Sequence, residues 1–333
     1  MARSDTLDLV ELAYRLDLDE QAWLAEIAAA AHAQLDRGLG VSVYTLETRG
    51  RRAGQVGAMV SHGADPGMVA FATSKLGSMP PPIAETVLRV PLGFAASSEI
   101  AGADAIRAFL GDNPYGMVDT CGVQSLDPSG SSLWIVVPAT EVITVQDAMR
   151  ERWQRVAAHL TAALRLRRGL ASLDAKHDDL GGADAVLETD FSVAHATARA
   201  TPELEALRAF AKQVDRARGR LRRDAPDDAL ELWKGLCEGT WSFIDHVDSD
   251  GRRYLVARHN EPAVATDRAL TAREQQVVAF VAMGHADKLV AYELGLAEST
   301  VQSHLSSAMR KMGIASRSEL VRTVLALSSQ GEG

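Results

Sequence analysis

The sequence predicts a multidomain α+β protein, in which two domains built on antiparallel sheets precede a small domain of four helices. Segments with the two-residue period of strands alternate with helical segments as far as residue 261. Residues 262–330, in contrast, carry only the three-to-four-residue period of helices. The length of 333 residues and the hydrophobic content of 47% are enough for two or three domains with buried cores.

The first predicted domain spans residues 1–178 and begins with helices at 7–16 and 21–35. Its other segments alternate between strand and helix signals: a strand at 40–48 with a hairpin partner at 55–61, a helix at 65–74, a Pro-rich crossing at 79–82, a helix at 104–110, and strands at 117–125 and 132–138 around the turn Asp127-Pro-Ser-Gly. A long helix at 144–173 closes the domain. This layout is similar to that of a GAF domain, a small-molecule or interaction sensor, and the resemblance is one of architecture alone.

The long helix allows two interpretations. Its apolar residues follow three-four spacing: Trp153, Val156, Leu160, Ala163 and Leu170. This stripe either pairs with its twin in a dimer or packs on its own sheet, and Arg167 falls within it. The basic run at 165–168 either contacts DNA or is a solvated helix end.

The second predicted domain spans residues 184–261. Its segments are strands at 185–188 and 192–196, helices at 203–220 and 227–239, and a hairpin of 241–247 and 252–258 with its turn at 248–251. The order resembles a shortened PAS-like domain. Trp233, Trp241 and Phe243 either line a ligand pocket or form plain core. The arginine-rich run at 216–223 is expected to be a solvated helix face.

The third predicted domain, residues 262–330, has recognisable helix ends. Thr271 and Glu274 form a capping box that opens the first helix, and Gly284 follows its end. The second helix, 287–294, stops at Gly295, and the third covers 298–312. A second capping box of Ser316 and Glu319 opens the fourth helix.

The motif carried by these helices has a specific resemblance. It consists of Leu270-Thr-x-Arg-Glu, Gly284, Lys288, Ala291, Leu294, Thr300-Val301-x-x-His304, Lys311-Met-Gly-Ile and Arg317. This pattern resembles the LuxR-type helix-turn-helix of bacterial transcription regulators and covers residues 265–328 with the family's spacing. The resemblance implies that double-stranded DNA is a partner and that the third helix enters the major groove.

Residue roles follow from the resemblance together with the helical period. Gln302, Ser303 and Ser306 lie opposite the apolar positions of the third helix and are expected to contact base edges, with Gln302 able to bond an adenine bidentately. The expected phosphate contacts are Lys288, Thr300, Arg310 and Lys311, while His304 supports the fold or contacts one phosphate. For each position the alternative is a solvated surface residue.

The chain departs from the family pattern in charge and caps. Gln302 stands where lysine is common, and Ala286 and Ala297 stand where serines usually open the second and third helices. Between residues 267 and 322 there are seven basic and six acidic residues. One copy of this domain should therefore bind DNA weakly, and a homodimer is expected.

Several classes are excluded by what the sequence lacks. The net charge of −9 argues against a protein that coats nucleic acid, so a basic groove must be local to the C-terminal domain. A phosphoacceptor receiver would open with a strand ending in paired acids, and a homoserine-lactone domain would place tryptophan and tyrosine at set distances around Asp65-Pro66. Neither pattern is present. No HExxH, GxSxG or phosphate-loop motif occurs, so no enzyme and no cofactor is indicated.

Metal, disulfide and membrane sites are not indicated either. Cys121 and Cys237 fit no CxxC spacing and are expected to be buried thiols. Asp174, His177, Asp178 and Asp179 suggest a solvated cap rather than a metal site. The absence of a signal core and of an 18-residue apolar run predicts a cytoplasmic protein that does not contact a membrane.

These observations predict a sequence-specific transcription regulator whose N-terminal region senses a small ligand or a protein partner and alters dimer geometry. Two alternatives remain. In the first, the N-terminal region is only an assembly platform for another protein, and the DNA-binding domain keeps its function. In the second, the DNA-binding domain has degenerated into a protein-interaction module. In the last case the substitutions Gln302→Ala and Lys311→Ala would leave activity intact.

Overall fold

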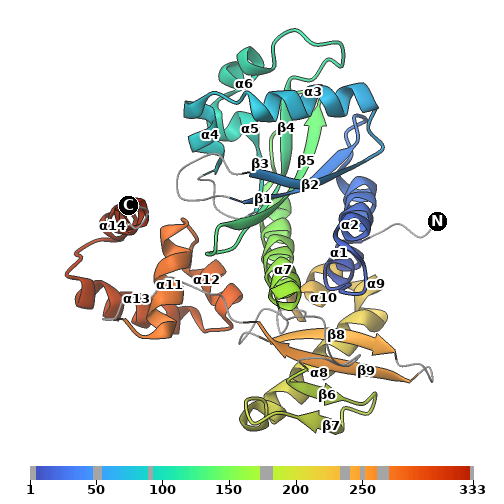
Figure 1. Ribbon diagram of the computed structural model, residues 1–333, viewed down its shortest axis with the longest axis vertical. Helices are drawn as coiled ribbons and strands as arrows, with labels where there is room; N and C mark the ends of the chain where they lie inside the picture. Colours follow the sequence, from blue (N-terminus) through green and yellow to red (C-terminus); the bar gives the residue numbers. More distant parts are fainter. Residues whose placement is uncertain are drawn as a thin grey trace.

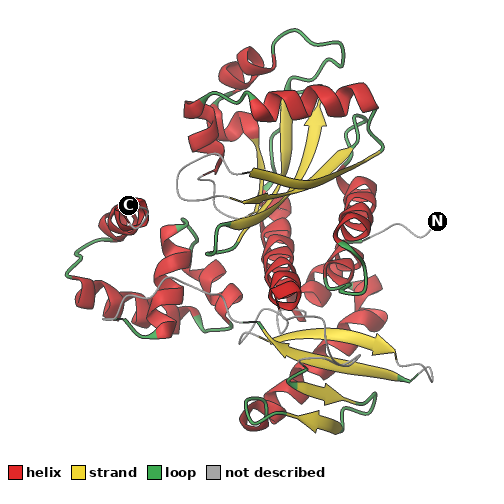
Figure 2. Ribbon diagram, in the orientation of Figure 1, coloured by secondary structure: helices red, strands yellow, loops and turns green. Residues whose placement is uncertain are grey.

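The computed structural model describes residues 5–47, 55–88, 93–172, 183–232, 241–247, 252–260 and 270–330. Within these ranges the chain forms two antiparallel sheets with their helices and a cluster of four helices at the C-terminal end (Figure 1, Figure 2). The predicted α+β class with antiparallel sheets followed by a helical domain is confirmed.

The first sheet contains five strands in the order β2-β1-β5-β4-β3. The strands are β1 (Val41–Glu47), β2 (Gln55–His62), β3 (Gly93–Ala96), β4 (Asp119–Leu126) and β5 (Ser131–Ala139). All neighbouring pairs are antiparallel, and the predicted β1–β2 hairpin is present. Because Tyr44 lies opposite Trp134 and Trp134 lies opposite Gln124, these three side chains form a row across one face of the sheet.

Helices cover both faces of this sheet (Figure 1). On one face lie α1 (Thr6–Ala13), α2 (Glu20–Leu35) and the long α7 (Asp147–Ser172); on the other lie α3 (Pro66–Gly77), α4 (Pro81–Leu88), α5 (Ser97–Ala101) and α6 (Ala103–Leu110). The predicted GAF-like layout is thereby confirmed. The Pro-rich crossing is only partly right, because α4 begins at Pro81. Proline is well tolerated there, since the first helical N–H groups have no partner within the helix.

The apolar stripe of α7 packs inside the chain as far as Ala163, and the side chain of Leu170 lies outside the described residues. Trp153, Val156 and Leu160 are buried among residues of α1, α2 and the sheet. The described side chains of the stripe are thus covered in the chain itself, which supports packing on its own sheet over pairing with a twin. Arg167 fits within the stripe because its guanidinium lies 4.8 Å from the centre of the Trp23 ring and donates to the backbone oxygens of Arg15 and Leu18.

The basic run at the end of α7 is neither a solvated helix end nor a free DNA-binding patch. Arg165 Nε lies 2.6 Å from Asp127 Oδ2, and both side chains are largely buried. Arg168 pairs with Glu47 and donates to Ser131. The sequence could not indicate these contacts, since β1 and the β4–β5 turn bring the acids from distant positions.

The second sheet has the order β7-β6-β9-β8. Its elements are β6 (Ala185–Leu187), β7 (Val193–Ala196), η1 (Thr201–Glu203), α8 (Leu204–Arg216), η2 (Ala217–Leu221), α9 (Arg222–Asp224), α10 (Pro226–Leu232), β8 (Trp241–Val247) and β9 (Arg253–His259). Trp241 and Phe243 are buried in the same hydrophobic cluster that contains the core of the first sheet, so they are core residues. Trp233 and the turn at 248–251 lie outside the described residues.

The arginine-rich run of the second domain is also not solvated throughout. Arg218 Nε lies 2.9 Å from Glu11 Oε1, and Arg222 Nε lies 2.8 Å from Asp5 Oδ2. Arg222 also pairs with Asp8 and Glu11. These ion pairs tie α1 to the second domain, and the distance of more than 200 residues along the chain hid them from the sequence pattern.

Some predictions concern single residues. Cys121 is a buried free thiol, and burial raises its pKa to about 12. Cys237 and the group Asp174, His177, Asp178 and Asp179 lie outside the described residues. Among the residues that the structure describes, no cluster of three histidine, cysteine or acidic side chains could hold a metal, and no helix could span a membrane.

Candidate nucleic-acid interface and sensory pocket

The C-terminal domain contains α11 (Ala272–Ala282), α12 (Asp287–Leu294), α13 (Glu298–Met312) and α14 (Arg317–Gln330). The predicted capping box opens α11: Thr271 Oγ1 accepts from the Glu274 N–H at 3.3 Å, and Glu274 Oε2 accepts from the Thr271 N–H at 2.8 Å. Gly295 and Gly313 end α12 and α13 at φ of 61° and 68°, where a residue with a Cβ would be strained.

The other predicted helix starts are confirmed in part. Ala286 and Ala297 precede α12 and α13 without a side-chain cap, as the sequence indicated. Before α14, Ser316 Oγ accepts from the Glu319 N–H at 3.2 Å, but the Glu319 carboxylate accepts from the Ala315 N–H rather than from that of Ser316. The second capping box is therefore shifted by one residue on its carboxylate side.

One face of α13 is exposed and polar. Val301, Leu305 and Ala308 point into the core of the domain, which also contains Val277, Phe280, Val281 and Leu294. On the opposite side the three predicted base-contacting residues are exposed: Gln302, Ser303 and Ser306. Arg310 continues this face at one further turn. The face can present hydrogen-bonding groups to a groove without disturbing the core.

The predicted phosphate-contacting residues differ in their surroundings. Lys288 and Arg310 are exposed and form no ion pair with a described residue. Thr300 and His304 of α13 are half-buried. Lys311, in contrast, is committed within the fold, because its Nζ lies 2.6 Å from Glu274 Oε2. Its hydrogen bond, together with those from Thr271 and Ser307, lowers the pKa of Glu274 to about 2.

Arg317, another motif residue, joins two helices of the domain. Its guanidinium pairs with the carboxylate of Asp287 at the start of α12 and donates to the backbone oxygen of His285. His285 is buried against Phe280, with ring centroids 5.3 Å apart, and burial lowers its pKa to about 3. Arg317 thus holds α14 and the start of α12 together, which explains its place in the motif without a contact to DNA.

Helix α12 also attaches the C-terminal domain to the rest of the chain. It lies beside α7 (Figure 1). One side of α12 enters the core of its own domain, whereas Leu289 and Tyr292 pack into the large cluster below the first sheet. The apolar residues predicted for α12 therefore serve two different cores. The signal for this in the sequence is a helix of eight residues with apolar side chains on two sides.

A chain of hydrogen bonds crosses this contact. The Tyr292 hydroxyl lies 3.0 Å from His159 Nε2, and the Tyr14 hydroxyl lies 3.3 Å from His159 Nδ1. Burial lowers the pKa of His159 to about 3, so its ring is neutral and has one donor and one acceptor nitrogen. One tyrosine must therefore donate and the other accept. The three residues connect α1, α7 and α12.

Next to this chain of bonds lies a buried acid that the sequence did not reveal as special. Glu293 is 3% exposed, and its Oε1 has no hydrogen-bond partner among the described residues. Burial raises its pKa to about 8, with Asp127 acting in the same direction and Arg165 against it. Nη2 of Arg165 is likewise buried without a partner in the described part of the chain. The contact between α7 and α12 thus includes imperfectly paired polar groups.

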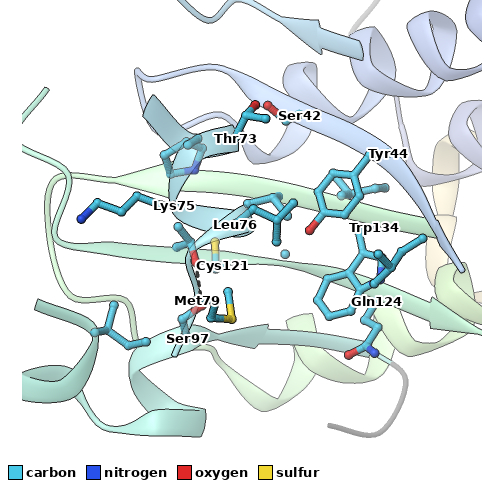
Figure 3. A pocket seen from close by; sticks show the side chains of 18 of the residues that line it. Ser42, Tyr44, Thr73, Lys75, Leu76, Met79, Ser97, Cys121, Gln124 and Trp134 are labelled. Carbon is cyan, nitrogen blue, oxygen red and sulfur yellow. Dashed lines mark hydrogen bonds between the residues drawn. The ribbon is translucent and has the colours of Figure 1, made fainter. Parts of the chain in front are cut away.

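A cavity of about 350 Å³ lies on the other face of the first sheet, towards α3 and α4. The row of Tyr44, Trp134 and Gln124 lines one side of it (Figure 3). The Tyr44 and Trp134 rings lie 6.2 Å apart between centroids and are nearly parallel, at 4°. Lys75 also lines the cavity, but its Nζ donates to the Phe109 backbone oxygen at 2.7 Å and in Figure 3 points away from the labelled tyrosine and tryptophan.

Solved structures give only distant likenesses. Escherichia coli SdiA is 10% identical with a TM-score of 0.32, covering 94% of this chain and 93% of that one. The phycoerythrobilin-bound GAF domain of a cyanobacterial phytochrome is 14% identical with a TM-score of 0.34, covering 50% of this chain and 100% of that one. The fold described above rests on the strand order and the helices, not on these values.

Sequence relatives agree over the C-terminal domain. Residues 268–324 match the bacterial regulatory proteins of the luxR family. The HTH-type transcriptional regulator MalT of Vibrio campbellii is 32% identical over 95 residues, which are 28% of this chain and 10% of that protein. The response regulator protein TodT of Pseudomonas putida is 42% identical over 69 residues, which are 20% of this chain and 30% of that protein. The chain thus spans less than a third of either relative. Its C-terminal domain belongs to the luxR family of bacterial regulatory proteins.

Proposed function

We propose that the protein is a sequence-specific DNA-binding transcription regulator in which α13 enters the major groove. The observation that carries this proposal is the exposed polar face of α13 on a luxR-family domain whose opposite face is buried. The groove is wide enough for a helix, and an amide such as that of Gln302 can bond an adenine edge with two hydrogen bonds. Ser303 and Ser306 lie next to it on the same face.

Lys288, Thr300, Arg310 and His304 are proposed phosphate contacts. Lys288 and Arg310 are exposed cations that form no ion pair with a described residue, and Thr300 contributes a hydroxyl in the first turn of α13. Lys311 can contact a phosphate only if it gives up its ion pair with Glu274, so it should contribute less to DNA affinity than Lys288 or Arg310. Because affinity for the phosphate backbone depends on the number of phosphates neutralised, a single domain with so few free cations should bind weakly. We therefore propose a homodimer on DNA.

The dimer surface is proposed to lie outside the apolar stripe of α7, which is buried within the chain. The three predicted domains, with boundaries at residues 178, 184 and 261, remain part of the proposal. Their cores are not independent, since one hydrophobic cluster includes residues of both sheets and of α12.

The N-terminal region is proposed to control the C-terminal domain through the contact of α12 with α7. Tyr292 on α12 is hydrogen-bonded to His159, and His159 is hydrogen-bonded to Tyr14, the residue that follows α1. A ligand or partner that shifts α1 or α7 would alter this contact, provided that it binds the docked and released states with different affinity. The imperfect pairing of Glu293 and Arg165 supports a contact that can open.

The test is selection of genomic DNA fragments by the purified full-length protein at two salt concentrations. Gln302→Ala should change or abolish the enriched sequence, while Lys288→Ala should weaken binding to all fragments and lower its salt dependence. Gln213→Ala replaces an exposed glutamine of α8 and should behave as wild type. Enrichment that is indifferent to Gln302 would instead favour the alternative of a protein-interaction module, and the proposal would fail.

A further inference from the structure

We propose that the cavity between the first sheet and helices α3 and α4 binds a flat, uncharged and largely apolar small molecule, held by Tyr44, Trp134 and Gln124. This inference deepens the proposed function and rests on it only for the role of the molecule as a signal. Binding itself requires no DNA. The cavity volume of about 350 Å³ lies within the range of small-molecule sites.

The pattern of side-chain sizes on the sheet creates the cavity. Because side chains alternate between the two faces of a strand, residues two apart in β1, β5 and β4 share the face towards α3. The row with Tyr44, Trp134 and Gln124 consists of large side chains. The next row consists of small residues from four strands: Ser42, Val136, Gly122 and Ala95. All of them line the cavity, so the space lies above the small row and beside the large one.

The large row provides a flat wall. The Tyr44 and Trp134 rings are nearly parallel, and each is less than a tenth exposed. A planar ring system can pack along such a wall in an offset-stacked arrangement, which aromatic pairs prefer to a face-to-face sandwich. A bulky, globular molecule would meet this wall over a smaller area.

Two polar groups on this row are available to a ligand. Other hydroxyls at the cavity are already paired: Ser97 with Thr120 at 2.6 Å, Ser42 with Ser61 at 2.8 Å, and Thr73 with the Val69 backbone oxygen at 2.8 Å. The Tyr44 hydroxyl and the Gln124 amide form no hydrogen bond with a described residue, although both residues are buried. Neither group is among the fully buried, unpaired polar atoms of the described residues, so both reach open space, where a hydrogen-bonding group of a bound molecule can replace water as their partner.

The wall of Tyr44 and Trp134 offers no charge to a ligand. None of the described residues that line the cavity is acidic, and Lys75 is the cation among them. Its ammonium donates to the Phe109 backbone oxygen, lies 5.5 and 5.4 Å from the centres of the Phe71 and Phe109 rings, and points away from Tyr44 and Trp134 in Figure 3. A charged molecule that packs on this wall would lose its hydration without a charged partner beside it. The site therefore selects neutral molecules with one or two hydrogen-bonding groups.

The test uses three probes of one shape: 2-naphthol, naphthalene and 2-naphthoate at neutral pH. Binding to the full-length protein is measured by calorimetry and by tryptophan fluorescence. We expect 2-naphthol to bind one to one, at least tenfold more tightly than 2-naphthoate. Gln124→Leu and Tyr44→Phe should each weaken 2-naphthol about fivefold and leave naphthalene almost unchanged, because only the phenol can use their polar groups.

The second part of the test fills the cavity with larger side chains. Val136→Phe and, separately, Ala95→Leu should abolish binding of 2-naphthol, whereas Val142→Phe, at a position that is 46% exposed, should not. Far-ultraviolet circular dichroism checks that each variant folds. Two filling variants on different strands are used, so that the inference is still tested if one of them does not fold. Equal affinity for 2-naphthoate, unchanged binding in both filling variants, or no saturable binding of any probe would overturn the inference. Since no DNA is present, such a result leaves the DNA-binding proposal intact, and failed DNA selection leaves this one intact.

Discussion

Glu293 provides the sharpest test of the contact between α12 and α7. Its carboxyl is buried where the C-terminal domain meets the rest of the chain, and burial raises its pKa from 4.5 to about 8. The substitution Glu293→Gln keeps the size and one acceptor oxygen but removes the ionisable proton. The variant should therefore lose a pH dependence of stability that the wild type has.

The magnitude follows from proton linkage. Between the unfolded pKa of 4.5 and the folded pKa of about 8, the folded chain holds one proton more than the unfolded chain at this site. Stability from this group is complete below the unfolded pKa and is lost as pH rises through the folded pKa. The free energy of unfolding should fall by about 1.4 kcal/mol per pH unit in this window, and by roughly 3 kcal/mol between pH 4.5 and pH 7.

The assay is urea unfolding of wild type and Glu293→Gln at half-unit steps from pH 5.5 to pH 8. Relative to that of the wild type, the free energy of unfolding of the variant should rise by on the order of 1 kcal/mol for each unit of increasing pH. Glu298→Gln removes an exposed acid at the start of α13 and should follow the wild type. If the difference in the free energy of unfolding between wild type and Glu293→Gln stays constant with pH, burial does not keep Glu293 protonated, and the argument for imperfectly paired polar groups between α12 and α7 is wrong.

Three further predictions concern the C-terminal domain. Leu294→Ala empties a fully buried position and should destabilise the domain by about 2–5 kcal/mol in chemical unfolding; a loss below about 1 kcal/mol would contradict its place in the core. Ala297→Ser supplies the missing cap of α13 and should raise stability by about 0.5–1 kcal/mol, a gain that should be absent when the exposed Ala315 is changed to Ser. Because hydrogen bonds lower the pKa of Glu274 to about 2, its stabilisation is present above the unfolded pKa of 4.5 and lost as pH falls towards 2, so the acid unfolding of Glu274→Gln should be less steep than that of wild type.

Local signals predicted the helical domain well. The capping residues Thr271 and Glu274, the glycine at 295 and the apolar period place α11, α12 and α13 at the observed positions. Such features depend on neighbours within one or two turns, so a single sequence contains all the information. For the same reason the exposure of Gln302 could be predicted from Val301 and Leu305 beside it.

Contacts between distant segments could not be predicted in this way. The arginines at 165, 168, 218 and 222 looked like solvated helix positions, yet each pairs with an acid from another element. Lys311 looked like a free phosphate contact and is paired with Glu274. A run of charge in a sequence does not reveal which acid the fold brings beside it.

The sequence by itself determined the α+β fold class, the helices of the C-terminal domain and the luxR-family motif of that domain, because these depend on periodicity and on caps formed by close neighbours. Only the tertiary structure decided what α7 packs against, where the N-terminal cavity lies and how α12 joins the two parts of the chain. Tyr14, His159 and Tyr292 are each separated by more than 100 residues along the chain. Their hydrogen bonds depend on strand order and helix packing, which no local pattern encodes.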